Sequence, residues 1–131
     1  MLTITLPWPS ADLSPNGGVA RWPAILATKK AREYAWGLAL SLMKPSGIQR
    51  GTWRGPVRVQ YTFHAKHDRD RDDDNFIRRM KPARDGIAKA LGMDDASFAL
   101  EPVIWGNRGD NTVDVTLTPA TVILPVRGGI A

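Results

Sequence analysis

The segment VRVQYTFHAKHDRDRDDDNFIRRMKPARDGIAKALG, residues 57–92, decides the fold because a strand pattern, an acidic run and a helix pattern follow one another in it. Apolar and polar residues alternate over residues 57–65, and this period of two predicts a half-buried strand. Apolar residues then recur at helical spacing over residues 76–91, and Gly92 suits a C-cap. Pro82 removes a backbone donor from this helix, so we expect a kink or two short helices.

The remaining elements are shorter patterns on either side of this segment. Alternating runs predict strands at residues 2–6, 98–105 and 112–119, and a helix-forming composition predicts a helix over residues 22–44. This order predicts one α+β domain over residues 1–131, with two layers: a small mixed sheet and two main helices packed on one face. We expect a flexible tail over about residues 120–131.

The composition limits the classes of protein and of site. The chain has 131 residues, the length of one ordinary domain. It has no cysteine, which excludes disulfides and thiolate zinc sites, so any metal must bind to oxygen or imidazole. No apolar run approaches the roughly 18 residues of a membrane span, and the first residues, MLTITLPWPS, lack the basic start and long apolar stretch of a signal peptide. We therefore expect a cytoplasmic protein without a membrane partner.

The net charge of +5 is unevenly distributed along the chain. Residues 68–95 hold eight of the thirteen acidic residues but only seven of the eighteen basic ones. A basic body around one acidic spot suits a metal-dependent enzyme that acts on a polyanion, because phosphates are attracted everywhere except where the cation binds. A solvated basic surface is the alternative interpretation of the same charge pattern.

The run HDRDRDDDN, residues 67–75, places five aspartates within seven positions. Carboxylates this close repel one another, which makes a cation their natural partner. An EF-hand loop that started at Asp68 would need glycine at its sixth position and glutamate at its twelfth. The chain has Asp73 and Arg79 there, so we exclude an EF-hand. A solvated acidic turn remains the alternative.

Geometry brings some of these aspartates together in the expected fold. Asp72 and Asp74 project to the same side of an extended chain, because side chains alternate with period two. Asp94 and Asp95 follow the predicted helix, where the chain turns back toward the sheet. A third carboxylate can therefore join the first two.

Basic residues follow the aspartate run at helical spacing. Asp74, Arg78, Lys81 and Asp85 occur at positions i, i+4, i+7 and i+11. They would line one helical face if the helix continued through Pro82. Acidic and basic side chains would then lie along one ridge.

Three aspartates beside a lysine form an oxygen-rich site that suits Mg²⁺, with Mn²⁺ as a substitute. The chemistry that such a site indicates is phosphodiester hydrolysis. The cation would polarise the phosphoryl group and lower the pKa of an attacking water, and the lysine would neutralise charge that builds up on the phosphate. We expect no nucleotide cofactor.

Four short motifs resemble those of one known family. They are ITLPWPS at residues 4–10, LSPNG at 13–17, DDDN at 72–75 and GMDDAS at 92–97. In this order they resemble the RusA-type Holliday-junction resolvases, which are small homodimeric endonucleases of bacteria and their prophages. The resemblance implies a RusA-like domain and magnesium-dependent, paired, symmetric nicking of four-way DNA junctions.

The resemblance also implies roles for individual residues. The first and third aspartates of the D-x-D-N motif would be catalytic and would bind metal, and here they are Asp72 and Asp74. The later aspartate pair of the family matches Asp94 and Asp95, and the second of the pair, Asp95, would be catalytic. Both members of this pair are candidate metal ligands.

The chain departs from the family pattern at the catalytic lysine. In the best-known member a lysine follows the asparagine of the motif by three positions, where this chain has Arg78, whereas Lys81 comes six positions after Asn75. We prefer Lys81 as the catalytic residue and Arg78 as a DNA-binding residue, and the exchanged roles are the alternative.

Other candidate DNA-binding residues lie in the first third of the chain. Lys29 and Lys30 on the predicted helix could hold a DNA backbone, and an exposed helix face is the alternative. The resemblance suggests that Asn16 and Arg21, in and beside the LSPNG motif, lie near the active site.

The leading hypothesis is a structure-selective endonuclease that cuts branched DNA as a homodimer. A four-way junction needs two symmetric nicks, this chain has one aspartate cluster, and closed two-fold dimers are the commonest homo-oligomers. The rival hypothesis is a non-catalytic basic DNA-binding protein whose aspartates end a helix or hold a structural cation.

Overall fold

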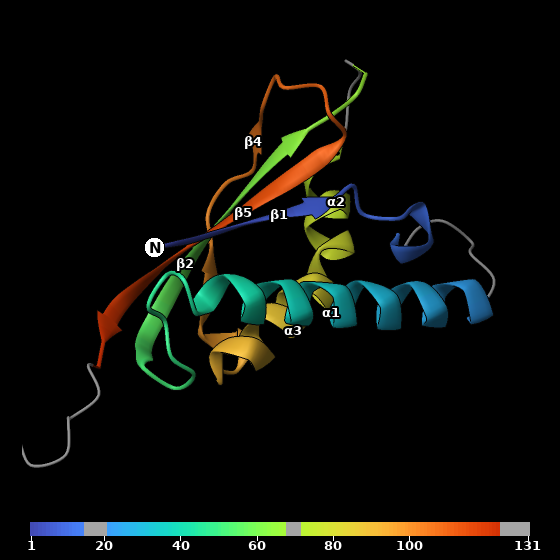
Figure 1. Ribbon diagram of the computed structural model, residues 1–131. Helices are drawn as coiled ribbons and strands as arrows, with labels where there is room; N and C mark the ends of the chain where they lie inside the picture. Colours follow the sequence, from blue (N-terminus) through green and yellow to red (C-terminus); the bar gives the residue numbers. More distant parts are fainter. Residues whose placement is uncertain (15–20, 68–71, 124–131) are drawn as a thin grey trace, which may run out of the picture.

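A computed structural model describes residues 1–14, 21–67 and 72–123 (Figure 1). Along the chain it forms β1 (Leu2–Pro7), α1 (Arg21–Met43), β2 (Trp53–His64), α2 (Asp73–Arg79), α3 (Lys81–Leu91), β3 (Phe98–Leu100), β4 (Ile104–Trp105) and β5 (Thr112–Val122). Two short 3₁₀ helices, η1 (Ala11–Leu13) and η2 (Asp95–Ser97), precede α1 and β3 respectively.

The five strands form one mixed sheet, which confirms the expected α+β class. The strand order is β1-β5-β2-β3, and β4 also pairs with β2. β5 pairs antiparallel with both β1 and β2, whereas β3 and β4 run parallel to β2. The two long strands, β2 and β5, are therefore the centre of the sheet, and β1 closes one edge.

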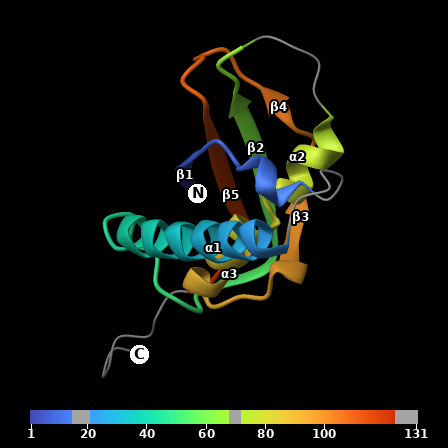
Figure 2. The ribbon, with the colours of Figure 1, turned by 90° about the vertical axis from the view of Figure 1, so that its right-hand side faces the viewer.

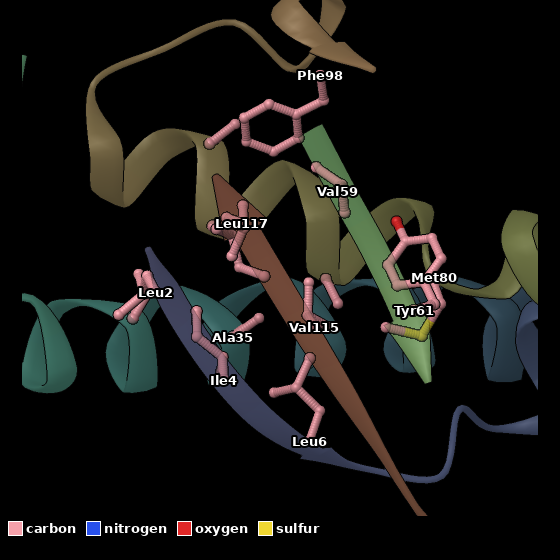
Figure 3. Close-up of a cluster of buried hydrophobic side chains, with 14 of the residues drawn as sticks. Leu2, Ile4, Leu6, Ala35, Val59, Tyr61, Met80, Phe98, Val115 and Leu117 are labelled. Atoms are coloured by element: carbon pink, nitrogen blue, oxygen red, sulfur yellow. The ribbon is translucent and has the colours of Figure 1, made fainter. Parts of the chain in front are cut away.

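One face of the sheet is buried by the helices. Alternate residues of the strands point to the same face, and those of β1, β2 and β5 on that face are almost fully buried (Figure 3). They are Leu2, Ile4, Leu6, Val57, Val59, Tyr61, Phe63, Val113, Val115 and Leu117. The residues between them are mostly threonine, arginine or aspartate, so the opposite face is polar.

The two main helices, α1 and α3, pack against each other as well as against the sheet (Figure 2). Their backbones approach closely at Gly86, where a Cβ would stand 2.2 Å from the carbonyl oxygen of Arg32 and 3.0 Å from the backbone nitrogen of Trp36. Ala35 and Ala39, which neighbour this contact along α1, are fully buried. Small residues on both helices therefore set the distance between them.

The helical pattern of residues 76–91 forms two helices, as the proline predicted. α2 ends at Arg79 and α3 begins at Lys81, with Met80 as the C-cap of one and the N-cap of the other. Pro82 then lies in the first turn of α3, where its missing N–H has no intrahelical partner to lose. The proline fits because the chain restarts a helix just before it.

The C-terminal half differs from expectation in two places. Residues 98–105 form two short strands, β3 and β4, because Pro102 lies between them and cannot donate to a ladder. β5 continues to Val122, which pairs with Trp53. The prediction of a flexible tail from about residue 120 is wrong at its start, because residues 120–122 belong to β5. Residues 124–131 of the expected tail lie outside the described part of the chain.

Among residues 1–14, 21–67 and 72–123, no helix combines enough length with enough apolar character to cross a membrane.

The close approach of α1 and α3 predicts opposite effects of alanine at two helical glycines. Gly86→Ala should lower the free energy of unfolding by about 2–3 kcal/mol, because the new methyl group meets rigid backbone of α1. Gly37→Ala, on α1 with nothing within 4 Å of a new Cβ, should raise it by about 0.5–1 kcal/mol. Urea unfolding followed by circular dichroism measures both. Equal effects would contradict the packing argument.

Candidate active site

The aspartate motif DDDN, residues 72–75, lies at the N-terminus of α2. Asp72 is the N-cap, and its side chain accepts a hydrogen bond from the backbone N–H of Asn75 at 3.3 Å. Asp73 Oδ1 accepts a hydrogen bond from the indole Nε1–H of Trp105 at 2.8 Å. Asp74 is exposed. Carboxylates in this first turn are favourable because the helix dipole is positive there.

A hydrogen bond joins the aspartate motif to the N-terminal part of the chain. Ser14 Oγ donates to Asn75 Oδ1 at 2.8 Å, across 61 positions of sequence. Ser14 belongs to the LSPNG run and Asn75 to the DDDN run. Two of the four motifs that carry the resemblance therefore meet in the folded chain.

Lys81, at the start of α3, lies between two carboxylates. Its Nζ is 2.8 Å from Asp85 Oδ1, one helical turn later, and 2.6 Å from Asp95 Oδ2 at the start of η2. The hydrogen bonds with Asp85 and then Asp95 raise the pKa of Lys81 above its usual value. The hydrogen bond from Lys81 lowers the pKa of Asp95 below its usual value, and Asp85 and Asp94 add smaller effects in the same direction.

This ion pair contributes to stability only between two pH limits. Because the pKa of Asp95 is lowered, the contribution is present above the usual carboxyl value of 3.8 and is lost as pH falls through the lowered pKa. Because the pKa of Lys81 is raised, the contribution is present below 10.5 and is lost as pH rises through the raised pKa. The Lys81 side chain is half exposed, so solvent screening keeps the contribution below about 1 kcal/mol.

Arg84 connects this charged ridge to the sheet. Its Nη1–H donates to the hydroxyl oxygen of Tyr61 on β2 at 3.0 Å, and its Nε lies 4.0 Å from Asp95 Oδ2. Tyr61 is fully buried, and burial raises its pKa against the opposing effect of Arg84. Because Arg84 is held by a core residue, it holds the Asp95 end of the ridge close to the sheet.

A cavity of about 530 Å³ opens beside Asp95 at the C-terminal end of α3. Three carboxylates, those of Asp85, Asp94 and Asp95, line it together with the cations Arg50 and Lys89. Asp94 also accepts a hydrogen bond from the backbone N–H of Ala96 at 2.9 Å and caps η2. The two cations complement the negative end of the α3 dipole, so they have a structural role at this position.

His64, at the end of β2, belongs to a structural network. Its Nδ1 accepts a hydrogen bond from the backbone N–H of Arg108 at 3.4 Å. Because Nδ1 is then an acceptor, the ring proton of a neutral His64 is on Nε2, which donates to Asp114 Oδ2 at 3.1 Å. Partial burial acts to raise the pKa of Asp114, but the hydrogen bonds from Arg108, Thr5 and His64 together lower it below its usual value. This network fixes the loop between β4 and β5.

The structure brings some of the predicted site residues together and leaves others apart. Lys81 and Asp95 are in contact, and Asp94 is next to them. Among the described residues, no group of three or more carboxylates or imidazoles is arranged to hold a metal ion. The shared metal site of Asp72, Asp74 and Asp95 therefore stays a prediction.

The predicted DNA-binding residues are exposed, with one outside the description. Arg78 lies in the last turn of α2, and Arg21, Lys29 and Lys30 lie on α1, all with exposed side chains. Asn16 lies outside the described residues. The ridge expected from Asp74, Arg78, Lys81 and Asp85 is interrupted at Met80, and within the described part of the chain its last two members form an ion pair.

Sequence reasoning missed Arg84, Tyr61 and Trp105 as parts of this region. Helical spacing would have placed Arg84, three positions after Lys81, on the same face as Lys81. The strand pattern predicts Tyr61 as a core residue, and it is buried. The hydrogen bond between its hydroxyl group and Arg84 corresponds to no pattern in the sequence. No sequence signal connects Trp105 with Asp73, because the hydrogen bond spans 32 positions.

Comparison with known proteins adds one relative. No family model matches the chain. A protein of Xylella fastidiosa strain Temecula1, named only as uncharacterized, is 40% identical over an alignment of 129 positions, and the match covers 92% of this chain and 78% of that protein. This chain belongs to the same family as that protein. The name of the relative states no activity, so any assignment of function depends on the residues themselves.

The contact between Lys81 and Asp95 predicts a change in one titration. Lys81→Gln should raise the pKa of Asp95 toward 3.8, because the hydrogen bond that lowers it is removed. Arg78→Gln is the matched control, a cation three positions earlier that forms no ion pair with a described residue, and it should leave the pKa of Asp95 unchanged. NMR titration of the aspartate side-chain carbons measures both. A shift in the Arg78 variant alone would exchange the two roles.

Proposed function

We propose that this protein is a metal-dependent, structure-selective DNA endonuclease that resolves four-way junctions by paired symmetric nicks, as the RusA-type resemblance implies. The observation that carries the proposal is the contact of Lys81 Nζ with Asp95 Oδ2 at 2.6 Å, across 14 positions of sequence. It supports the choice of these two residues from separate motifs as one catalytic centre. The contact between Ser14 and Asn75 supports the same grouping of motifs.

The charged residues have distinct tasks in this proposal. The half-exposed Lys81 ammonium can leave Asp95 for a phosphate oxygen, where it neutralises charge that develops during cleavage. Arg84, anchored on Tyr61, then keeps Asp95 in place. The exposed guanidinium of Arg78 suits bidentate binding of a neighbouring phosphate. Lys29, Lys30 and Arg21 would add attraction for the DNA backbone.

Mg²⁺, or Mn²⁺ in its place, belongs to the proposal through the resemblance. When bound, such an ion polarises the phosphoryl group and lowers the pKa of the attacking water. Asp72, Asp74 and Asp95 are the residues proposed to hold it, with Asp94 beside them. In the described arrangement they do not form a ligand group, so we derive no step through the ion.

The rival function is a non-catalytic basic DNA-binding protein, in the same cytoplasmic setting and with a structural cation site. One observation favours it: several of the aspartates already have structural partners. Asp72 and Asp94 cap helices, Asp73 accepts a hydrogen bond from Trp105, and Asp95 is paired with Lys81. Cleavage assays distinguish the two functions.

Asp74→Asn separates cleavage from binding. With Mg²⁺ and a synthetic four-way junction, the variant should lose nicking by at least about 100-fold, because a proposed ligand of the ion is removed. It should bind the junction as tightly as the wild type or more tightly, because a negative charge near phosphate is lost. Gel assays of nicking and binding measure both.

Glu33→Gln is the charge-matched control, since it removes one exposed acid from α1. It should nick normally. Near-normal nicking by the Asp74 variant would remove Asp74 from the site. A wild-type protein that binds junctions but cuts none with Mg²⁺ or Mn²⁺ would favour the non-catalytic function.

The working unit in the proposal is a two-fold symmetric homodimer. α1 exposes several large apolar side chains, among them Trp22 at 71%, Leu26 at 62% and Tyr34 at 54%. Exposed apolar groups gathered on one element are typical of an interaction surface. Two copies would supply the two cutting centres that symmetric nicking needs.

Light scattering should therefore give twice the chain mass of 14.4 kDa, because each chain contributes one cutting centre. A cruciform plasmid at limiting enzyme should yield linear product in a single binding event. Leu26→Asp on α1 should lower the dimer mass toward that of the monomer and turn the main product into nicked circles. A monomeric wild-type mass on junction DNA, with nicked circles as product, would contradict the dimer.

A further inference from the structure

An exposed aromatic surface lies beside the aspartate motif. Trp105 is 37% exposed and its neighbour Ile104 is 49% exposed, and together they form β4. Successive strand residues point to opposite faces of a sheet, so Ile104 is not part of this surface, and we name the exposed part of the Trp105 ring the Trp105 shelf. β4 pairs in parallel with the end of β2, where Phe63 is the partner of Trp105 (Figure 1). The shelf therefore lies at the end of the strand that leads into the acidic run.

The indole ring of the shelf is held from several sides. The ring of Phe63 lies 5.2 Å away at 30° and packs against one side of it, and Phe76 meets it edge-on at 5.5 Å and 83°. The hydrogen bond from Nε1 to Asp73 fixes the rotation of the ring. The ring is therefore held by these contacts while 37% of the residue stays exposed.

The segment that follows the shelf is fixed as well. At Gly106 a Cβ would stand 2.3 Å from Nδ1 of His64, and the backbone N–H of Gly106 donates to the carbonyl oxygen of Phe63 at 2.8 Å. The glycine lets the chain pass directly over the buried histidine. The shelf is accordingly rigid before any ligand binds, and a rigid aromatic surface loses little conformational entropy on binding.

The shelf adjoins the candidate catalytic residues. Its hydrogen-bond partner, Asp73, stands between Asp72 and Asp74 in the chain, and consecutive Cα atoms are about 3.8 Å apart. A group placed on the shelf is therefore close to the backbone of both Asp72 and Asp74, the proposed catalytic residues on either side of Asp73. In DNA, the group found at that distance from a phosphodiester bond is a nucleobase.

We propose that the Trp105 shelf stacks against an unstacked nucleobase at the branch point of the DNA substrate. This inference rests on the proposed function and adds a base-binding subsite to it. Aromatic side chains bind bases of any sequence, because every base has a π-face. Such a base is available at a branch point or in a single strand and is absent from an intact duplex. The shelf would therefore select DNA structure rather than sequence.

Fluorescence of the adenine analogue 2-aminopurine tests this subsite. Junctions that carry the analogue at one branch nucleotide at a time are bound to the Asp74→Asn protein, which prevents cutting. At the nucleotide that stacks on Trp105 we expect strong quenching of the analogue's fluorescence in the bound junction. Adding Trp105→Leu to the Asp74→Asn protein should remove this quenching. Junction affinity should fall about tenfold or more with leucine, and affinity for a duplex of the same arms should stay constant.

Trp105→Phe is the matched control variant. It lacks the hydrogen bond to Asp73 but keeps an aromatic ring, so it should retain quenching and bind the junction within about threefold of the parent protein. Both variants are first compared with the parent by circular dichroism and thermal unfolding. A leucine variant that is folded and keeps both the quenching and the affinity would overturn the inference while leaving the proposed endonuclease function intact.

A third substrate keeps the subsite and the proposed function distinguishable. If the parent protein shows no preference for junctions over duplex, the junction-resolving function fails. Single-stranded DNA with the same analogue then decides the subsite: loss of quenching and affinity with Trp105→Leu supports it, and equal binding overturns it. A change from dimer to monomer mass in the leucine variant would also overturn it, because the shelf would then be a subunit contact.

Discussion

The backbone of α3 lies against the backbone of α1 at Gly86, where a Cβ would stand 2.2 Å from the carbonyl oxygen of Arg32. This contact fixes the height and rotation of α3 above the sheet. Ile87 and Leu91 then point into the core. Because the apolar face of α3 is fixed in this way, the orientation of its charged face, which begins at Lys81, is fixed as well. The contacts of Lys81 and Arg84 with their partners depend on that orientation.

The break at Met80 divides the acidic segment into two parts with different environments. Before it, the carboxylates of α2 meet backbone N–H groups and an indole. After it, Lys81 and Arg84 meet the carboxylates of Asp85 and Asp95. A single straight helix could not satisfy both sets of contacts, because α2 would then extend along the α3 axis rather than toward Trp105 and η1.

The ion pairs of Lys81 suit a site that changes partners. An exposed salt bridge in water contributes little net free energy, so exchange of a carboxylate for a phosphate costs little. Arg84 is different, because it is mostly buried and hydrogen-bonded to a core tyrosine. The region therefore combines one cation that can move with another that cannot.

The sequence by itself determined the α+β class, the buried face of the sheet and the division of the helix near Pro82. Each of these follows from a local period or from the covalent geometry of proline, which neighbours in the chain already define. The sequence and its family resemblance also indicated Lys81 and Asp95 as candidate site residues, which form an ion pair in the structure, and their catalytic roles stay predictions. Only the tertiary structure decided that β3 and β4 add in parallel to β2, that Arg84 anchors on Tyr61, and that Trp105 bonds to Asp73. These contacts join separate strands or residues 23 and 32 positions apart, so tertiary packing decides them, whereas no pattern within a single segment does.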